Sequence, residues 1–323
     1  MEDYPRSLTK FEERFGTEEA CWKYLAQMRW PDGFICPACN SQQGWQTKRG
    51  LWLCQQCGRQ TSVTAGTIFH GTHKPLTLWF RAMWHITSQK YGANALGLQR
   101  VLGLGSYQTA WEWLHRLRRA MVRPNRDQLS GLVQVDETYV GGKKPGKTGR
   151  GAEGKVLVAI AVEDKAPNGL GRIRLATIKD ASADSLSGFV REMVAPGSVI
   201  KTDDWLGYST LSGQGFRRQI LPPKELKLPH LVAALLKRWL LGTYQGAVRP
   251  SQLAYYLDEF TFRFNRRTSH FRGKLFYRLV QQALQVDPIF RKNLKADGLS
   301  LNYDNFDDLA FDQTLHFGAT GVK

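Results

Sequence analysis

The residues of this sequence best suited to chemistry begin with four cysteines in two Cys-x-x-Cys pairs. The pairs are Cys36 with Cys39 and Cys54 with Cys57, and the segment 40–53 separates them. Each pair can place two sulfurs on one tight turn, and two such turns close a tetrahedron around Zn²⁺. Four protein ligands leave no open position, so the sequence predicts a zinc ribbon whose metal is structural. A redox-active pair is the alternative, which two pairs at ribbon spacing disfavour.

Two aspartates follow apolar, strand-like stretches farther along the chain. Asp136 closes the stretch that begins at Leu132, and Asp203 closes a later one that begins at Ser198. Carboxylates at the ends of buried strands are costly unless they face a cation or solvent. Side by side they could hold two Mg²⁺ ions about 4 Å apart, which would activate a water or a 3′-hydroxyl for phosphodiester transfer. The residues alone leave a simpler role open, because strand-end aspartates are common turn formers.

Longer blocks of sequence surround these aspartates. They are VDETYVGGK at 135–143, KTDDWLGY at 201–208, LLKRWLLGT at 235–243 and YLDEFTFRFNRR at 256–267. In this order they resemble the catalytic regions of a group of bacterial insertion-sequence transposases of the DDE class, the ISXO type, which also carry an N-terminal zinc ribbon. The resemblance covers roughly residues 10–285. It implies a ribonuclease H-like domain that cleaves and joins DNA with bound Mg²⁺ or Mn²⁺.

The resemblance also implies the roles of individual residues. By position, Asp136 and Asp203 match metal ligands, and Lys237 matches a lysine that recurs after the third ligand. The third ligand, normally Glu or Asn seven positions before that lysine, falls on His230. Positions 230 and 237 share one face of a helix, two turns apart. Imidazole is a poor ligand for Mg²⁺ and a better one for Mn²⁺ or Zn²⁺, so His230 favours Mn²⁺.

Two features depart from the family pattern. Asp204 replaces the usual Gly beside the second aspartate, and the segment from Asp203 to His230 is short for this group. Glu225 and Glu259 therefore remain alternatives for the third ligand. Glu259 also has a structural interpretation, as an exposed or ion-paired residue on the helix that carries three arginines.

The hydrophobic pattern predicts a multidomain α+β protein. The expected regions are an N-terminal helix (about 8–28) with the zinc ribbon (1–72), a helical region (73–128), an α/β domain (129–295) and an acidic tail (296–323). The family resemblance implies that the α/β domain is the ribonuclease H-like catalytic domain. In the helical region, two short apolar helices flank the turn GLGS at 103–106, which is the pattern of a helix-turn-helix.

Strands and helices of the catalytic domain follow from the same pattern. Strands are predicted at 132–136, 156–162, 173–178 and 198–202, and helices at 182–193, 229–241 and 250–265.

The charge of the chain points to a polyanionic partner. Its 45 Lys and Arg against 28 Asp and Glu give a net charge of +17 and a pI near 9.8. Tyr244 is the best candidate for stacking on a base. The residues expected to contact DNA are Arg116, Arg118, Arg119, Lys143, Lys144, Arg238, Arg263, Arg266 and Arg267.

Composition also limits where the protein works. The sequence has no apolar run long enough to cross a membrane and no signal-peptide core at its start, which disfavours membrane insertion and secretion. An odd number of cysteines, five, does not suit a disulfide framework and favours a reducing cytoplasm. A bacterial, nucleoid-associated protein is expected.

Together these features predict a transposase that binds the terminal inverted repeats of its element through the ribbon and helix-turn-helix, then acts on target DNA. Two element ends must be held together, so the resemblance implies a homo-oligomer, at least a dimer on DNA. Two rivals remain: a catalytically inactive DNA-binding derivative, and a ribonuclease H-like nuclease without joining activity. The acidic tail could dock on a basic surface or stay solvated.

Overall fold

The computed structural model describes residues 2–123, 125–141, 155–167, 169–290 and 294, in two compact units. The first unit combines Met1–Asn125 with Thr268–Leu294, and the second contains Arg126–Arg267. Within the described residues no helix is both long and apolar enough to span a membrane.

The first unit contains a bundle of helices and a small sheet, whose strands lie between α2 and α3 in the sequence. Its helices are α1 (Leu8–Phe15), α2 (Glu18–Arg29), α3 (Leu76–Ser88), α4 (Ala95–Leu102), α5 (Tyr107–Ala120) and α9 (Arg272–Ala283). Aromatic rings fill its core, with Phe276 of α9 in contact with Phe11, Phe15 and Phe80. The sequence pattern assigned α9 to the region 129–295, whereas α9 packs against α3 and α5.

The N-terminal helix expected over about 8–28 is interrupted. Two helices form instead, because Thr17 has extended backbone angles and its hydroxyl accepts a hydrogen bond from the amide of Ala20. This side chain satisfies an amide that the first turn of α2 leaves unpaired. Ser7 caps α1 in the same way, through the amide of Lys10.

The cysteine pairs lie around a three-stranded antiparallel sheet. Its strands, in the order β1-β2-β3, are β1 (Gly44–Gln46), β2 (Trp52–Cys54) and β3 (Gln60–Thr61). Trp52 stacks on Phe34 with 5.2 Å between ring centroids, whereas the side chain of Trp45 is 51% exposed. Trp52 therefore provides the apolar cover that so small a sheet needs, and Trp45 remains at the surface.

Helices α4 and α5 meet at a sharp turn. Gly103 ends α4 in the left-handed conformation (φ 62°), which glycine adopts without steric cost, and Ser106 caps α5. Trp113 of α5 stacks on Trp79 of α3, with 3.9 Å between centroids. The two short helices expected from the sequence are thus present, and α5 is fixed to α3 along one side.

The second unit is built on a mixed five-stranded sheet in the order β6-β5-β4-β7-β8. Its strands are β4 (Leu132–Val140), β5 (Val156–Asp164), β6 (Leu170–Ile178), β7 (Val199–Thr202) and β8 (Arg217–Ile220). Strand β4 is central, antiparallel to β5 and parallel to β7. The helical elements are α6 (Ala183–Met193), η1 (Leu206–Gln214), η2 (Pro223–Glu225), α7 (Lys227–Tyr244), η3 (Pro250–Gln252) and α8 (Leu253–Phe264).

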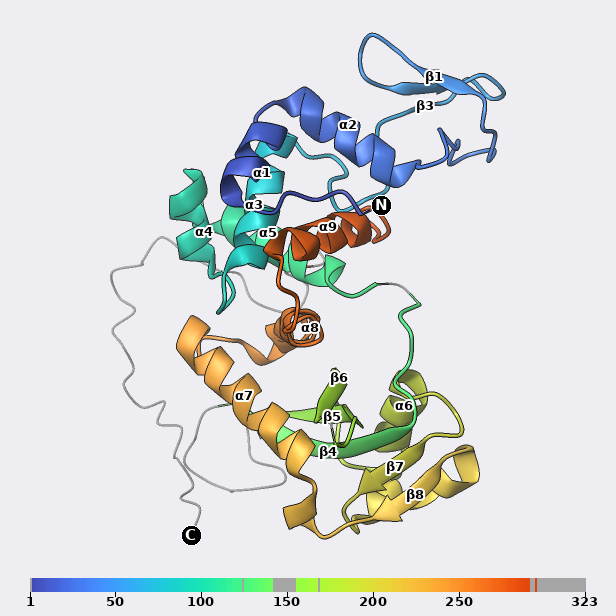
Figure 1. Cartoon of the computed structure of the whole chain (residues 1–323), viewed down its shortest axis with the longest axis vertical. Helices are drawn as coiled ribbons and strands as arrows, with labels where there is room; N and C mark the ends of the chain where they lie inside the picture. Colours follow the sequence, from blue (N-terminus) through green and yellow to red (C-terminus); the bar gives the residue numbers. More distant parts are fainter. Residues whose placement is uncertain (1, 124, 142–154, 168, 291–293, 295–323) are drawn as a thin grey trace. The chain divides into compact units, whose positions relative to one another are not determined.

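Each face of this sheet buries its own core. Helices α7 and α8 cover one face of the sheet (Figure 1). On that face Val158 and Ile160 of β5 belong to one buried cluster with Leu236 of α7. Helix α6 and η1 cover the other, where Val133 and Val135 pack with Tyr208. Burial on both faces explains the long apolar runs of these strands.

The ribbon geometry leads to a prediction about zinc. Replacement of Cys57 by Ser should abolish binding of about one zinc per chain and unfold the ribbon, since metal binding and folding are coupled at such sites. Elemental analysis of reduced, chelator-free protein measures the metal, with Cys21→Ala, a cysteine outside the cluster, as the control that keeps it. An absence of zinc from the unaltered protein would refute the prediction.

Candidate functional site

The four cysteine sulfurs form a compact cluster. All lie within 4.8 Å of one another, with 3.7 Å between the sulfurs of Cys36 and Cys57 and 3.6 Å between those of Cys39 and Cys54. Hydrogen bonding from the backbone of Ala38 lowers the pKa of the Cys36 thiol to about 6. Sulfur ligands at these separations suit a tetrahedral zinc ion, so the cluster fits structural Zn²⁺.

The register of two parallel strands relates the positions of the two predicted aspartates. Strands β4 and β7 pair from Leu132 with Val199 to Gln134 with Lys201. Each pair has the same difference in residue number, and Asp136 and Asp203 differ by that same number. The same register, if continued two positions past the last pair, would set the two aspartates side by side where β7 ends. Consistently, the charge of Asp203 is among the influences that raise the pKa of Asp136.

Asp136 itself is placed differently from the sequence expectation. It lies within β4 rather than at its end, because the strand continues to pair with β5 as far as Val140 and Val156. Its carboxylate accepts a hydrogen bond from the amide of Glu137 at 2.8 Å. Burial, together with the charges of Glu137 and Asp203, raises its pKa to about 6. A nearby cation would therefore stabilise the ionised form.

His230, in the first turn of α7, contacts the carboxylate of Asp136. Its Nε2 lies 3.0 Å from Oδ2 of Asp136, and its side chain is 53% exposed. The imidazole lowers the pKa of Asp136 against the effect of burial. Of the three candidates for the third position, His230 is thus the one in direct contact with Asp136.

The two alternative glutamates are occupied elsewhere or point to solvent. Glu259 is fully buried on α8, where its carboxylate accepts hydrogen bonds from Arg263 at 2.8 Å and from the hydroxyl of Tyr244 at 3.1 Å. Glu225 is exposed in η2. The structural interpretation of Glu259, as an ion-paired residue, agrees with this geometry.

Asp203 is held by its own turn. Its Oδ1 accepts a hydrogen bond from the amide of Trp205 at 3.1 Å, and its backbone carbonyl accepts one from Arg218 of β8 at 2.8 Å. Asp204 is exposed. The extra charge that departs from the family pattern therefore faces solvent beside the site.

On the opposite face of β4, Glu137 accepts a hydrogen bond from the buried hydroxyl of Tyr208 at 2.7 Å. Burial raises the pKa of Tyr208, and the Glu137 carboxylate adds to this, so the phenol stays a donor. The sequence reasoning missed this pair, although strand alternation alone indicates that neighbours in VDE face opposite sides.

Lys237 lies on α7, partly buried, with its pKa lowered by burial and by the charge of Lys155. Asp136, Asp203 and His230 are not as tightly grouped as the cysteines. Among the described residues, only the cysteine cluster brings three or more ligand atoms of His, Cys, Asp or Glu within 4.8 Å of one another. Oxygen donors from two aspartates with one imidazole nitrogen are a chemically suitable set for Mn²⁺ and, less well, Mg²⁺.

Two residues expected to contact DNA are instead buried within the protein. Arg118 is 1% exposed and donates to the carbonyl of Ala93, so it fastens α5 to the segment before α4. Tyr244 is buried with its hydroxyl on Glu259, which corrects the expectation that it stacks on a base. The hydrophobic periodicity of the sequence shows that these helices are amphipathic. It does not show how wide the buried face of each helix is.

The remaining basic candidates differ in exposure. Arg119, Arg238 and Arg267 are exposed, and Arg116 and Arg266 are partly buried. Arg263 is bound to Glu259, and Arg267 also donates to the carbonyl of Leu170. Lys143, Lys144 and the tail 296–323 lie outside the described residues.

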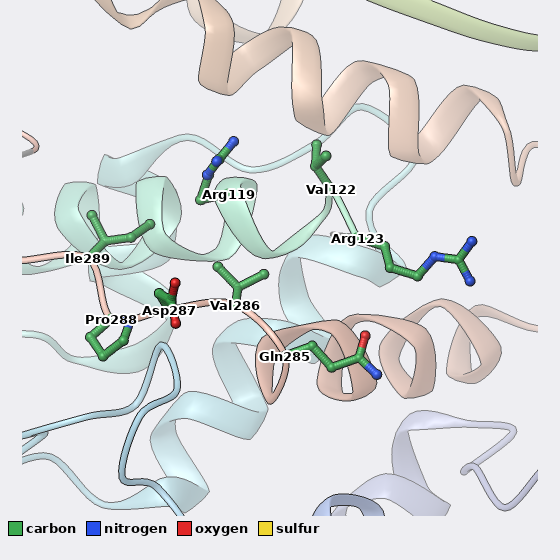
Figure 2. Close-up of a pocket in the computed structure, with 8 residues that line it drawn as sticks. All are labelled: Arg119, Val122, Arg123, Gln285, Val286, Asp287, Pro288 and Ile289. Carbon is green, nitrogen blue, oxygen red and sulfur yellow. The ribbon is translucent and has the colours of Figure 1, made fainter. Parts of the chain in front are cut away.

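The cavity beside α5 does not form a second reactive site. It has a volume of about 260 Å³ and is lined by residues that include Arg119, Arg123 and Asp287. Figure 2 shows the side chains of Arg119 and Arg123 pointing in different directions.

A long stretch of the first unit carries positive charge alone. Residues 33–111 contain no Asp or Glu. All of its basic residues other than histidine are exposed: Lys48, Arg49, Arg59, Lys74, Arg81, Lys90 and Arg100. The half-exposed Trp45 is on the strand that leads to the first two of them.

Known proteins resemble both parts of the chain. A family described as the transposase zinc-ribbon domain matches residues 16–60, and the ISXO2-like transposase domain matches residues 128–265. An "uncharacterized protein in transposable element ISH50" of Halobacterium salinarum is 25% identical over 278 residues, which is 77% of this chain and 91% of that protein.

Among solved structures, a chain of the simian T-cell lymphotropic virus intasome in complex with PP2A regulatory subunit B56 gamma has a TM-score of 0.30 and 14% identity. The match covers 60% of this chain and 74% of that one. A similarity this low adds nothing to the assignment, which depends on the family matches. The chain therefore combines a transposase zinc-ribbon domain with an ISXO2-like transposase domain, as its sequence blocks had indicated.

Proposed function

We propose that this protein is an active transposase that cleaves and joins DNA strands by a two-metal mechanism at Asp136, Asp203 and His230. Two observations support the proposal. Asp136 and Asp203 are separated in sequence by the same number of residues as the paired positions of β4 and β7. In addition, Nε2 of His230 lies 3.0 Å from Oδ2 of Asp136. The order β6-β5-β4-β7-β8 supports a ribonuclease H-like assignment for the second unit.

The proposed ligands would bind through carboxylate oxygens and Nε2 of His230. Bound metal ions would activate the attacking water or 3′-hydroxyl and stabilise the leaving oxygen. The chain holds these side chains on strand and helix backbone, which favours reaction through orientation of the reacting groups. Lys237, two helical turns from His230, would contribute positive charge to the reacting phosphate. No covalent intermediate with the enzyme is required.

DNA is the partner that the charge distribution favours. The stretch 33–111, with its exposed cations and without carboxylates, suits the phosphate backbone. We assign to it, with helices α4 and α5 as a helix-turn-helix, the binding of terminal inverted repeats. Arg118 is left out of this interface because it is buried. Because two element ends must be held together, we propose that the protein acts as at least a dimer on DNA. It would act in the cell compartment that holds the chromosome.

An inactive DNA-binding derivative is the second candidate. The substitution of a family carboxylate by His230 is the observation that favours it. A nuclease of the same fold without joining activity is the third, and only its products distinguish it from a transposase.

The catalytic assignment predicts a hierarchy among variants. Asp136→Asn and Asp203→Asn should abolish cleavage of an element end, and His230→Ala should lower it severely, because each removes a metal ligand. His230→Glu should be at least as active as the unaltered protein in Mg²⁺, since carboxylates suit a hard cation, whereas the unaltered protein should prefer Mn²⁺.

Glu225→Ala and Glu259→Ala are the matched controls in the same cleavage assay. Glu259→Ala leaves Arg263 and Tyr244 without their acceptor, so its thermal stability is measured alongside. Full activity of His230→Ala together with a folded but inactive Glu225→Ala or Glu259→Ala would contradict the assignment of the third ligand.

Product analysis separates the three candidate functions. With a pre-cleaved element end and a circular target, the transposase should yield joined products in Mn²⁺. Nicks without joined strands would instead identify a nuclease. DNA binding without any product in either metal would identify the inactive derivative.

The charge distribution predicts how salt affects DNA binding. Lys48→Ala/Arg49→Ala should weaken binding and reduce the slope of log affinity against log salt by about 2, as two phosphate contacts are lost. A gel-shift or anisotropy titration across salt concentrations measures the slope. Lys10→Ala/Lys23→Ala, two exposed cations outside 33–111, should leave it unchanged. Equal effects of the two pairs would argue against a localised interface.

A further inference from the structure

We propose that Gln134 is a positioning residue that fixes the start of α7 and thereby holds His230 against Asp136. The proposal deepens the function proposed above, because it concerns the same site, but its structural part can be tested without DNA chemistry.

The start of α7 lacks the usual means of satisfying its backbone amides. The residue at its N-cap, Leu226, makes no side-chain hydrogen bond, and the first turn contains no acidic residue. The first amides of any helix have no partner within the helix. Here the amide of Leu228 donates to Oε1 of Gln134 at 3.3 Å, although the two residues are far apart in sequence. A side chain of the central strand thus takes the place of a local cap.

The amide group of Gln134 is itself oriented by its neighbours. Its Nε2 donates to Oδ2 of Asp164 at 3.1 Å, and Nζ of Lys201 lies 3.0 Å from the same oxygen. Because Asp164 attracts the nitrogen, the oxygen of Gln134 must face α7. Gln134 is 6% exposed, and the side chains of Asp164 and Lys201 are 10% and 19% exposed, so water competes little for these bonds.

The spacing of these contacts couples them to the site. Gln134 and Asp136 are two positions apart on β4 and therefore point to the same face of the sheet. Their partners, Leu228 and His230, are also two positions apart, in the first turn of α7. The His230 side chain is about half exposed, so its position depends on the backbone of that turn as well as on packing around the ring.

The same geometry also permits a purely structural role, in which Gln134 only satisfies a buried amide. In that case its loss should lower the stability of the whole unit. A positioning role instead predicts a local change at α7 and a loss of turnover with little change in DNA affinity.

The test compares three changes in the zinc-loaded, full-length protein. Gln134→Leu keeps the volume but removes both hydrogen bonds, and Gln134→Glu places a second carboxylate against Asp164. Gln134→Glu/Asp164→Asn exchanges amide and carboxylate, so that the bond between positions 134 and 164 can form again with donor and acceptor reversed, while the amide of Leu228 still donates to an oxygen of residue 134. Gln134→Asn, which is too short to reach Leu228, serves if Gln134→Leu does not fold. Gln282→Leu, a buried glutamine of the first unit, is the matched control.

Hydrogen–deuterium exchange of a peptide over 227–236 reports on the start of α7 without metal or DNA. Gln134→Leu should speed its exchange about tenfold, as expected for loss of a helix cap, and leave peptides of β5 unchanged. Mn²⁺ affinity, measured by electron paramagnetic resonance, should fall, with Asp136→Asn as the reference for loss of the site. Turnover should fall about tenfold while the Kd for DNA stays within about twofold. The exchanged pair should recover all three.

Unchanged exchange at 227–236 in Gln134→Leu, or faster exchange throughout the second unit with a matching fall in Tm, would overturn the proposal. So would an exchanged pair that is no better than Gln134→Glu alone. If the unaltered protein forms no DNA products in either metal, the proposed function fails, and the exchange and Mn²⁺ measurements still decide the role of Gln134.

Discussion

The parallel pairing of β4 with β7 is the constraint on which the second unit depends. It joins two stretches that are distant in sequence and pairs residues as far as Gln134 and Lys201, two positions before Asp136 and Asp203. Two like charges near each other in a buried setting repel, which contributes to the raised pKa of Asp136. Apolar cores are buried on both faces of the sheet, and α7 places the imidazole of His230 against Asp136.

Local patterns were the part of the structure most accessible from sequence. The two cysteine pairs lie close together in the chain, at 36–57, so their spacing alone predicted a cluster that the fold forms. The strands from β4 to β7 and the main helices followed from hydrophobic periodicity. Long motifs around Asp136 and Asp203 identified the transposase domain, which the family matches confirm. The roles of those residues remain predictions.

Contacts between distant segments were not accessible in this way. The burial of Arg118 depends on the segment before α4, and that of Tyr244 depends on Glu259 of α8. The continuation of β4 past Asp136 depends on its pairing with β5. The bond between Gln134 and Leu228 joins distant parts of the chain, and nothing near either residue indicates it. Periodicity identifies an amphipathic segment, but only the packing partners decide which polar groups become buried.

The alternation of Asp136 and Glu137 has an evolutionary consequence. Their side chains serve opposite faces, one toward His230 and the other toward Tyr208. Deletion or insertion of a single residue upstream in β4 would exchange their faces, since a shift of one residue inverts the whole strand. Descendants of this sequence can therefore vary by substitution within the strand, while changes in length are confined to the connections between strands. Gaps in future alignments of relatives should fall outside residues 132–140.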